Sequence, residues 1–187
     1  MDGTLGCHLC EARYPIADGV ADFRDAEAGG ASSAPRPART ADAGVPATQD
    51  DVLRAAALLG HTEGAGFTVL AGPWVRTARM LATLAPVPVV VLDPPADLAM
   101  GDGVSGVRVG HRLPFADGAA RGIALGADAP EAILLDAVRA LRTGGRLVAP
   151  AEVPVPPGIT ELARDAESWV GERPAAPSPP IALRRAR

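Results

Sequence analysis

Apolar residues at helical spacing predict a helix between Thr48 and Gly60. The segment Thr48-Gln-Asp-Asp51 has the form of a capping box that opens a helix, and Gly60 is typical of a helix end. The apolar positions between these two signals are Val52, Ala55, Ala56 and Leu59.

A strand, a helix and a second strand are predicted next. The continuous apolar run from Phe67 to Ala71 is typical of a buried strand, and the chain turns at Gly72. Val75 to Ala85 has apolar residues at helical spacing, and Val87 to Leu92 is again strand-like and ends at Asp93. This pattern predicts a βαβ unit, whose two strands lie parallel in one sheet.

Strands and helices continue to alternate after this unit. Glu131 to Arg142 is the strongest helical pattern in the chain, and Gly144-Gly145 is expected to end that helix. Short strands are predicted at 107–109, 123–125 and 146–149, with a turn at 113–118. The alternation predicts an α/β fold with a doubly wound, mostly parallel sheet.

Composition divides the chain into three parts. Residues 1–25 contain a predicted β-hairpin, whose turn at Asp18-Gly19 supplies positive φ angles. Residues 26–47 are rich in small residues and proline and lack periodicity, so we expect a flexible linker. Residues 48–187 hold the predicted α/β domain.

Charge and hydropathy exclude several classes of function. The 187 residues carry a net charge of −4 with a pI near 5.3, which gives no basic field for a nucleic-acid backbone. No apolar stretch approaches the roughly 18 residues of a membrane helix, and the start of the chain has no signal-peptide pattern. We expect a cytoplasmic protein that binds neither nucleic acid nor a membrane.

Gly72 and Asp93 are the first candidates for a ligand site. They are 21 positions apart (93 minus 72), close to the roughly 20 that separate the glycine turn from the ribose-binding acid in nucleotide-binding βαβ units. An acid at the end of a strand is also a common turn former, and Pro94-Pro95 follows it here. Asp93 is therefore either a ribose contact or a structural residue.

Two segments resemble a known family. Leu113-Pro-Phe-Ala-Asp-Gly118 and Ala140-Leu-Arg-Thr-Gly-Gly-Arg-Leu-Val148 resemble motifs of the class I S-adenosylmethionine-dependent methyltransferases, especially the small-molecule, ubiquinone-biosynthesis-like branch. Cys7-x-x-Cys10 with Tyr14-Pro-Ile-x-Asp-Gly-Val20 resembles the zinc-ribbon-like module that accompanies such enzymes. The resemblance implies a methyltransferase-like Rossmann fold, S-adenosylmethionine as the cofactor, and a small-molecule substrate if the chain is active.

The cofactor loop departs from that family. Its members have an acid at the end of the first strand and then three glycines that contact the cofactor, whereas this chain has Leu70 and then Gly72, Trp74 and Arg76. Trp74 places an indole where the family needs no side chain, and Pro73 removes a backbone donor. We therefore expect the pocket for adenosine and methionine to be closed.

The family's other acidic contacts to the cofactor are also replaced. Gly110-His-Arg112 stands where an acid contacts the adenine amino group, and Arg121 replaces the acid that opens the fourth strand. The His-Arg pair is either an ordinary part of a loop or a contact for an anionic ligand. Gly72, Asp93 and Arg112 are thus the candidate binding residues, and no catalytic residue is assigned.

The cysteine pair offers half of a metal site. A tetrahedral zinc site has four ligands, commonly two Cys-x-x-Cys pairs, and Cys7 and Cys10 form a single pair. We expect a hairpin without metal, with a bound zinc ion and a redox-active pair as the alternatives.

The carboxyl-terminal part is expected to shorten the sheet. Members of the family end with a helix and two antiparallel strands. Here Ile159 to Val170 is expected to be an amphipathic helix with Trp169 in the core, which leaves Pro180 to Arg184 for the strands. A shortened sheet has an open edge, which is a place for a protein partner.

Three functions are compatible with these residues. The first is a methyltransferase-fold protein that has lost S-adenosylmethionine binding and serves as a non-catalytic binding or regulatory subunit. The second is an active methyltransferase for a small molecule, with an unusual cofactor loop. The third is a module that binds another nucleotide or a small anion through Asp93 and Arg112. The lost glycines and the shortened sheet favour the first.

Overall fold

The computed structural model describes residues 2–7, 11–24 and 46–175. In these ranges lie ten strands, three α-helices and the 3-10 helix η2 (Gly72–Thr77). The α-helices are α1 (Gln49–Leu59), α2 (Ala78–Leu84) and α3 (Glu131–Ala140). The strands are β1 (Gly3–Gly6), β2 (Arg13–Ala17), β3 (Val20–Asp22), β4 (Phe67–Leu70), β5 (Val89–Leu92), β6 (Val104–Arg108), β7 (Ala120–Ala124), β8 (Leu141–Pro150), β9 (Thr160–Arg164) and β10 (Ser168–Glu172).

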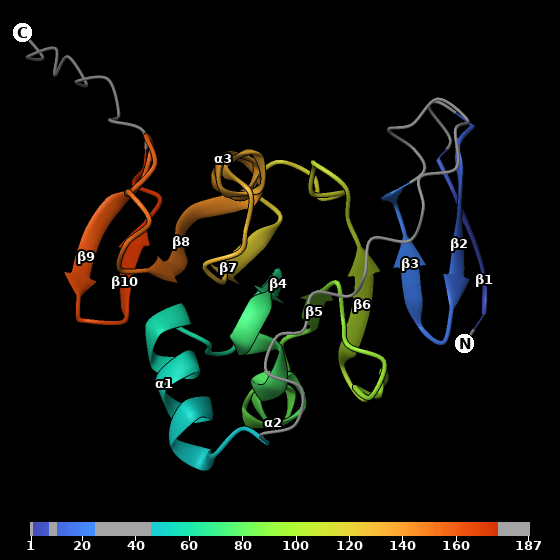
Figure 1. Ribbon diagram of the computed structural model, residues 1–187, viewed down its shortest axis with the longest axis horizontal. Helices are drawn as coiled ribbons and strands as arrows, with labels where there is room; N and C mark the ends of the chain where they lie inside the picture. Colours follow the sequence, from blue (N-terminus) through green and yellow to red (C-terminus); the bar gives the residue numbers. More distant parts are fainter. Residues whose placement is uncertain (1, 8–10, 25–45, 176–187) are drawn as a thin grey trace, which may run out of the picture.

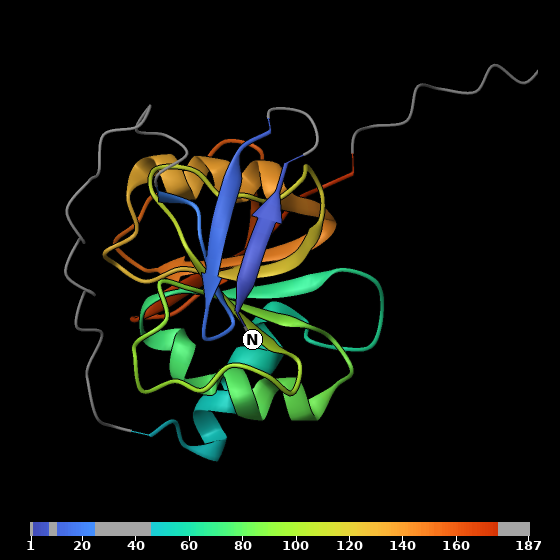
Figure 2. The same ribbon diagram turned by 90° about the vertical axis from the view of Figure 1, so that its right-hand side faces the viewer.

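The ten strands form one sheet in the order β1-β2-β3-β6-β5-β4-β7-β8-β10-β9. The strands from β3 to β8 in this order pair in parallel, and the pairs at both ends of the sheet are antiparallel. Helices α1 and α2 cover one face and α3 lies on the other (Figure 1). Figure 2, which views the sheet from its β1 end, shows these three layers edge-on. The mostly parallel sheet between helices confirms the predicted doubly wound α/β fold.

Helix α1 begins and ends where the sequence predicts. The Thr48 hydroxyl accepts a hydrogen bond from the Asp51 backbone N–H, and the Asp51 carboxylate accepts one from the Thr48 backbone N–H, which completes the capping box. Gly60 ends the helix in the left-handed region, at φ 58°. The predicted βαβ unit is present as well, because β4 and β5 pair in parallel on either side of η2 and α2.

The segment 159–170 is not a helix, and the expected shortening of the sheet is wrong. The segment contains β9 and most of β10, joined by a tight turn in which Asp165 Oδ1 accepts the backbone N–H groups of Glu167 and Ser168. β10 pairs antiparallel with β8 and buries Trp169, whose Nε1 donates to the Val153 carbonyl at 2.8 Å. Every residue of β9 is exposed. A strand without a buried face lacks the alternation of apolar and polar residues by which a strand is recognised in a sequence. The sheet therefore ends at the edge of β9.

Helix α3 ends two residues earlier than predicted, at Ala140 rather than Arg142. β8 begins at once with Leu141, so Gly144-Gly145 lies inside a strand. The Arg173 guanidinium, from the chain after β10, donates to the carbonyls of Val138 and Arg139 at 3.1 and 3.0 Å. A cation from a distant segment thus satisfies the carbonyl end of the helix, a role that sequence reasoning assigned to the glycines.

The amino-terminal hairpin joins the same sheet. Asp18 and Gly19 have φ angles of 51° and 77°, which confirms the predicted turn between β2 and β3. β3 pairs in parallel with β6, so the hairpin continues the central sheet. The predicted division at residues 25 and 47 stays a prediction, since the expected linker and Cys10 lie largely outside the described residues.

Candidate functional site

The strand order reverses between β4 and β7. From β4 the chain runs outward through β5 and β6, then returns to the other side of β4 and continues through β7 and β8. β4 and β7 pair in parallel, so their carboxyl ends, at Leu70 and Ala124, lie side by side. In sheets of this kind a ligand binds in the crevice outside such a pair of strand ends.

Two glycines lie close to each other at this crevice. Gly72 follows β4 with a φ of 61°, and a Cβ added to it would lie 2.9 Å from the Gly126 Cα. A Cβ added to Gly126 would lie 3.0 Å from Pro73 Cδ and 2.9 Å from Asp128 Oδ1. The glycine at 72 thus permits contact with the chain after β7, where the resemblance assigned it to contact with a cofactor.

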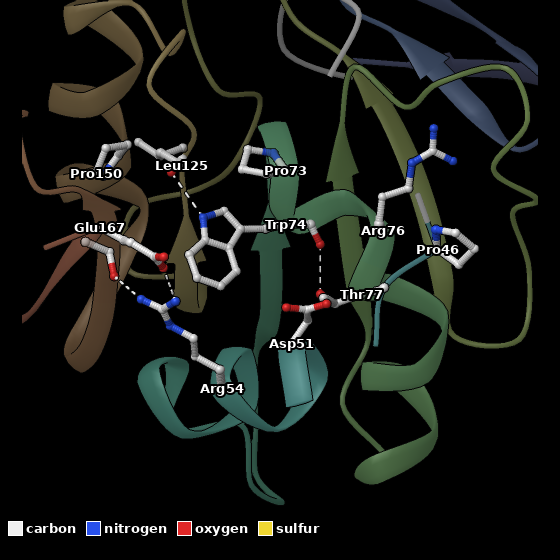
Figure 3. Close-up of a pocket in the computed structure, with 12 residues that line it drawn as sticks. Pro46, Asp51, Arg54, Pro73, Trp74, Arg76, Thr77, Leu125, Pro150 and Glu167 are labelled. Atoms are coloured by element: carbon white, nitrogen blue, oxygen red, sulfur yellow. Dashed lines mark hydrogen bonds and ion pairs between the residues drawn. The ribbon is translucent and has the colours of Figure 1, made fainter. Parts of the chain in front are cut away.

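Trp74 holds the two strand ends together. Its Nε1 donates to the Leu125 carbonyl, just beyond β7, at 3.2 Å. The Thr77 hydroxyl donates to the Trp74 carbonyl at 2.7 Å, which fixes the backbone of η2 beside the ring (Figure 3). The partly buried ring packs on the apolar cluster of α1, α2 and the adjacent face of the sheet. The indole is thus a fixed bridge across the ends of β4 and β7.

A pocket of about 350 Å³ lies beside this bridge, on the α1 face. The Trp74 ring forms part of its wall, with side chains of α1 below it and the chain after β7 and β8 above it (Figure 3). The lining residues are Pro46, Ala47, Asp51, Arg54, Pro73, Trp74, Arg76, Thr77, Leu125, Pro150, Glu167 and Ser168. Asp93 and Arg112 are outside this set, so the pocket and the residues predicted to bind a cofactor do not coincide.

Ion pairs fix the charged side chains of the pocket. Arg54 pairs with Glu167, and it contacts Asp165 at 2.9 Å, which ties α1 to the turn between β9 and β10. The hydrogen bond that Arg54 donates to Glu167 raises the pKa of Arg54, against the opposing effect of burial. Arg76 pairs with Asp97 at 2.7 Å, and this hydrogen bond lowers the pKa of the Asp97 carboxyl. Both guanidinium groups therefore already have carboxylate partners.

Asp93 lies at the end of β5 with an unusual backbone. Its φ is 45°, and its Oδ1 accepts the backbone N–H of Val109 at 3.2 Å, which links the ends of β5 and β6. This bond is what a turn-forming acid would make. The side chain is exposed, so a role as ribose contact stays a prediction.

Arg112 belongs to the loop between β6 and β7 and is exposed. Burial opposes ionisation of Asp136 on α3, but hydrogen bonds from Arg139 and the Leu113 backbone N–H outweigh it and lower the pKa of this carboxyl. The charge of Arg112 acts in the same direction. The role of Arg112 as an anion contact stays a prediction.

Arg139 explains the Leu113–Gly118 motif in structural terms. Its guanidinium donates to the carbonyls of Phe115 and Leu113 at 2.8 and 3.1 Å and to Asp117 Oδ1 at 2.6 Å. These bonds hold the loop onto α3, and the Asp136 and Asp117 carboxylates raise the pKa of Arg139. The motif therefore shapes a turn before β7.

Arg121 is buried in β7, and none of the described ion pairs includes it. Its guanidinium donates to the carbonyl of Gly64 at 3.3 Å and to Thr62 Oγ1 at 3.2 Å. Burial lowers the pKa of Arg121, and the nearby positive charge of Arg142 lowers it further. The residue ties the segment after α1 to the sheet, at the end opposite the crevice, and does not contact the candidate site.

Sequence reasoning singled out Trp74 and Gly72 but missed Gly126, Asp51 and Arg54 as neighbours of the site. Gly126 carries a signal, since a glycine directly after a predicted strand marks a close approach of backbone. Asp51 was assigned only to the capping box. Among the residues that the structure describes, no three His, Cys, Asp or Glu side chains gather as they would around a metal, and no helix has the length and apolar content to cross a membrane.

No protein-family model and no curated protein sequence matches the chain. A putative S-adenosyl-L-methionine-dependent methyltransferase from Methanococcus maripaludis superposes with a TM-score of 0.51 and 12% identity, over 68% of this chain and 84% of that protein. Geranyl diphosphate C-methyltransferase from Streptomyces coelicolor A3(2), in complex with S-adenosyl-L-homocysteine, gives 0.45 and 18% identity. This match covers 54% of our chain and spans less than half of that enzyme, 43%. The first likeness shows the methyltransferase-type Rossmann-like fold.

Proposed function

We propose that this chain is a methyltransferase-fold protein that does not hold S-adenosylmethionine and acts by binding, as a non-catalytic recognition or regulatory subunit. The supporting observation is the crevice between β4 and β7. Gly72 and Gly126 are in backbone contact there, and the Trp74 indole is bonded across the strand ends. A cofactor that lies over this point needs the space that these groups occupy.

The magnitudes support the same proposal. A single ribose bond to Asp93 would supply about 1 to 3 kcal/mol as a charge-assisted contact. Micromolar affinity requires about 8 kcal/mol. Contacts with the glycine loop would have to supply most of the remaining free energy of binding. In this chain two of the glycines of that loop are replaced, by Trp74 and Arg76.

Ultraviolet crosslinking with radiolabelled S-adenosylmethionine tests the proposal. We expect no label on the wild-type chain, and no change when Asp93 is replaced by alanine. Label that appears on the wild type and disappears in Asp93→Ala would instead support a working cofactor site.

The pocket beside Trp74 favours a second candidate, an active methyltransferase for a small molecule. Its volume of about 350 Å³ lies within the range of small-molecule sites. It adjoins the strand ends at which a methyl donor would lie in this fold. Transfer of labelled methyl groups to small molecules of a cell extract, dependent on this chain, would favour this candidate.

The edge of β9 supports a protein partner for the proposed subunit. Thr160–Arg164 is exposed at every position and lies last in the strand order of the described sheet. An exposed edge can accept a strand from another chain. We propose that this partner is cytoplasmic. We also propose that the amino-terminal hairpin is a zinc-ribbon-like module without a bound metal. Metal analysis of the purified protein tests the second point.

A further inference from the structure

The pocket beside Trp74 has one wall of fixed aromatic surface. The indole cannot rotate freely, because its Nε1 donates to the Leu125 carbonyl and its backbone is held by Thr77. Pro73, Pro150 and Ala47 extend the apolar lining. The pocket therefore offers a preorganised aromatic and apolar surface to a small ligand.

Two acids and two arginines are the charged residues that line this surface. The two guanidinium groups of the lining, Arg54 and Arg76, are matched by Glu167 and Asp97. Asp165 contacts Arg54 as a second carboxylate, so this guanidinium is already shared between two acids. Each of the two guanidinium groups thus has at least one carboxylate partner.

Asp51 adds a carboxylate that has no cationic partner among the described ion pairs of the chain. Its side chain accepts from the Thr48 backbone N–H at 2.8 Å and from the Thr48 hydroxyl at 2.7 Å, and both donors are neutral. Figure 3 shows the carboxylate below the Trp74 ring, where it lines the same pocket. Two carboxylates, Asp51 and Glu167, thus line the pocket together with two guanidinium groups. Asp165 and Asp97 contact those guanidinium groups from outside the lining.

We propose that this pocket binds a small organic cation through an alkylated ammonium group, with the Trp74 ring as its aromatic wall and Asp51 as its counter-charge. An indole face attracts such cations through its quadrupole more strongly than the other aromatic rings do. Both guanidinium groups of the lining are paired with carboxylates, whereas Asp51 forms no described ion pair. Its carboxylate therefore repels anionic ligands and favours a positive group of low hydration. The inference rests on the proposed binding function and names the ligand class for it.

Three probes of the same shape test the charge requirement: choline, its neutral isostere 3,3-dimethylbutan-1-ol, and the anion 3,3-dimethylbutanoate. The chain has two tryptophans, so two indole N–H signals report in a ¹H–¹⁵N spectrum. We expect choline to shift the Trp74 signal saturably, with an affinity about tenfold above that of the alcohol. The signal of Trp169, which packs in the other apolar cluster, is the internal control and should not move.

Two variants test the assigned residues. Asp51→Asn keeps the size of the side chain and is expected to weaken choline binding about fivefold while leaving the alcohol unchanged. Asp50→Asn is the matched control, because Asp50 is exposed on the same helix and does not line the pocket. Trp74→Leu keeps an apolar wall without the aromatic ring, and choline binding should fall to the level of the alcohol.

Equal binding of choline and the alcohol, stronger binding of the anion, no binding of choline, or an Asp51→Asn variant with unchanged affinity would each overturn the inference. These outcomes leave the proposed loss of S-adenosylmethionine binding intact, because that cofactor is titrated separately. Saturable binding of S-adenosylmethionine would overturn the proposed function instead.

Discussion

Gly126 is the position at which one added carbon should disturb the crevice most. A Cβ there would lie 2.9 to 3.1 Å from Asp128 Oδ1, Pro73 Cδ and the Gly72 Cα. Two of these neighbours are a proline ring and a backbone atom, and displacing either of them would strain the fold. We expect Gly126→Ala to lower the free energy of unfolding by about 1 to 3 kcal/mol, measured by urea denaturation.

Gly3→Ala is the matched control for that substitution. An added Cβ at Gly3 meets no atom within 4 Å, so its effect should stay within about 0.5 kcal/mol. If Gly126→Ala is as stable as Gly3→Ala, the two strand ends are not in the close contact described.

His61 should make the stability of the protein depend on pH. The ring is buried, with Nδ1 3.0 Å from Thr68 Oγ1 and Nε2 3.1 Å from the Leu81 carbonyl oxygen. Burial lowers the pKa of His61 below its usual 6.5, the bond to Leu81 opposes this, and the charge of Arg121 adds to the lowering. The unfolded chain therefore binds a proton at a pH where the folded protein does not, and stability falls as the pH drops below 6.5.

Urea unfolding at about pH 7.5 and about pH 5.5 measures this effect, since most carboxyl groups stay ionised across that window. His61→Gln should lose less stability between the two conditions than the wild type does. An identical loss in the wild type and in His61→Gln would show that the ring is protonated in the folded protein.

The residues of the crevice show what a sequence can reveal about a site. Trp74 and Gly72 were identifiable because they stand at positions of a known motif. The replacement of two of its glycines, at positions 74 and 76, can be seen in the sequence alone. Gly126 was missed because its role depends on contact with a loop 54 positions away (126 minus 72). Asp51 was assigned correctly to a cap, yet its place in a pocket depends on how α1 lies against the sheet.

The capping box of α1 should contribute measurably to stability. Thr48 provides the hydroxyl that accepts the Asp51 N–H, and loss of such a cap costs about 1 kcal/mol. We expect Thr48→Ala to reduce the free energy of unfolding by that amount, measured by thermal or urea denaturation. Gln49→Ala, at the next position, should change stability little, because alanine is a good helix former. Equal effects of the two substitutions would contradict the assigned cap.

Elements were predictable where their signals are local. α1 and the β2–β3 turn follow from caps and from an Asp-Gly pair, and both are confirmed. The segment 159–170 failed because β10 is a strand only through its pairing with β8, some 20 residues earlier in the chain. Likewise α3 ends at Ala140 through a contact with Arg173, which no local pattern reveals.

The sequence predicts the class of the sheet but not the order of its strands. Alternation of strands and helices indicates a parallel, doubly wound sheet, but it does not place β10 between β8 and β9 or β3 beside β6. The latter pairing brings the amino-terminal hairpin to the far end of the sheet from β9 (Figure 1). The crevice at the ends of β4 and β7 lies between these two edges of the sheet. Whether this crevice can hold a cofactor decides which of the proposed functions is right.

Titration calorimetry of the purified chain with S-adenosylmethionine is the most direct test of the proposed loss of cofactor binding. The contact of Gly72 with Gly126 and the bond from Trp74 to Leu125 predict no saturable heat of binding up to about 1 mM cofactor. Saturable binding with a dissociation constant in the micromolar range would contradict the account.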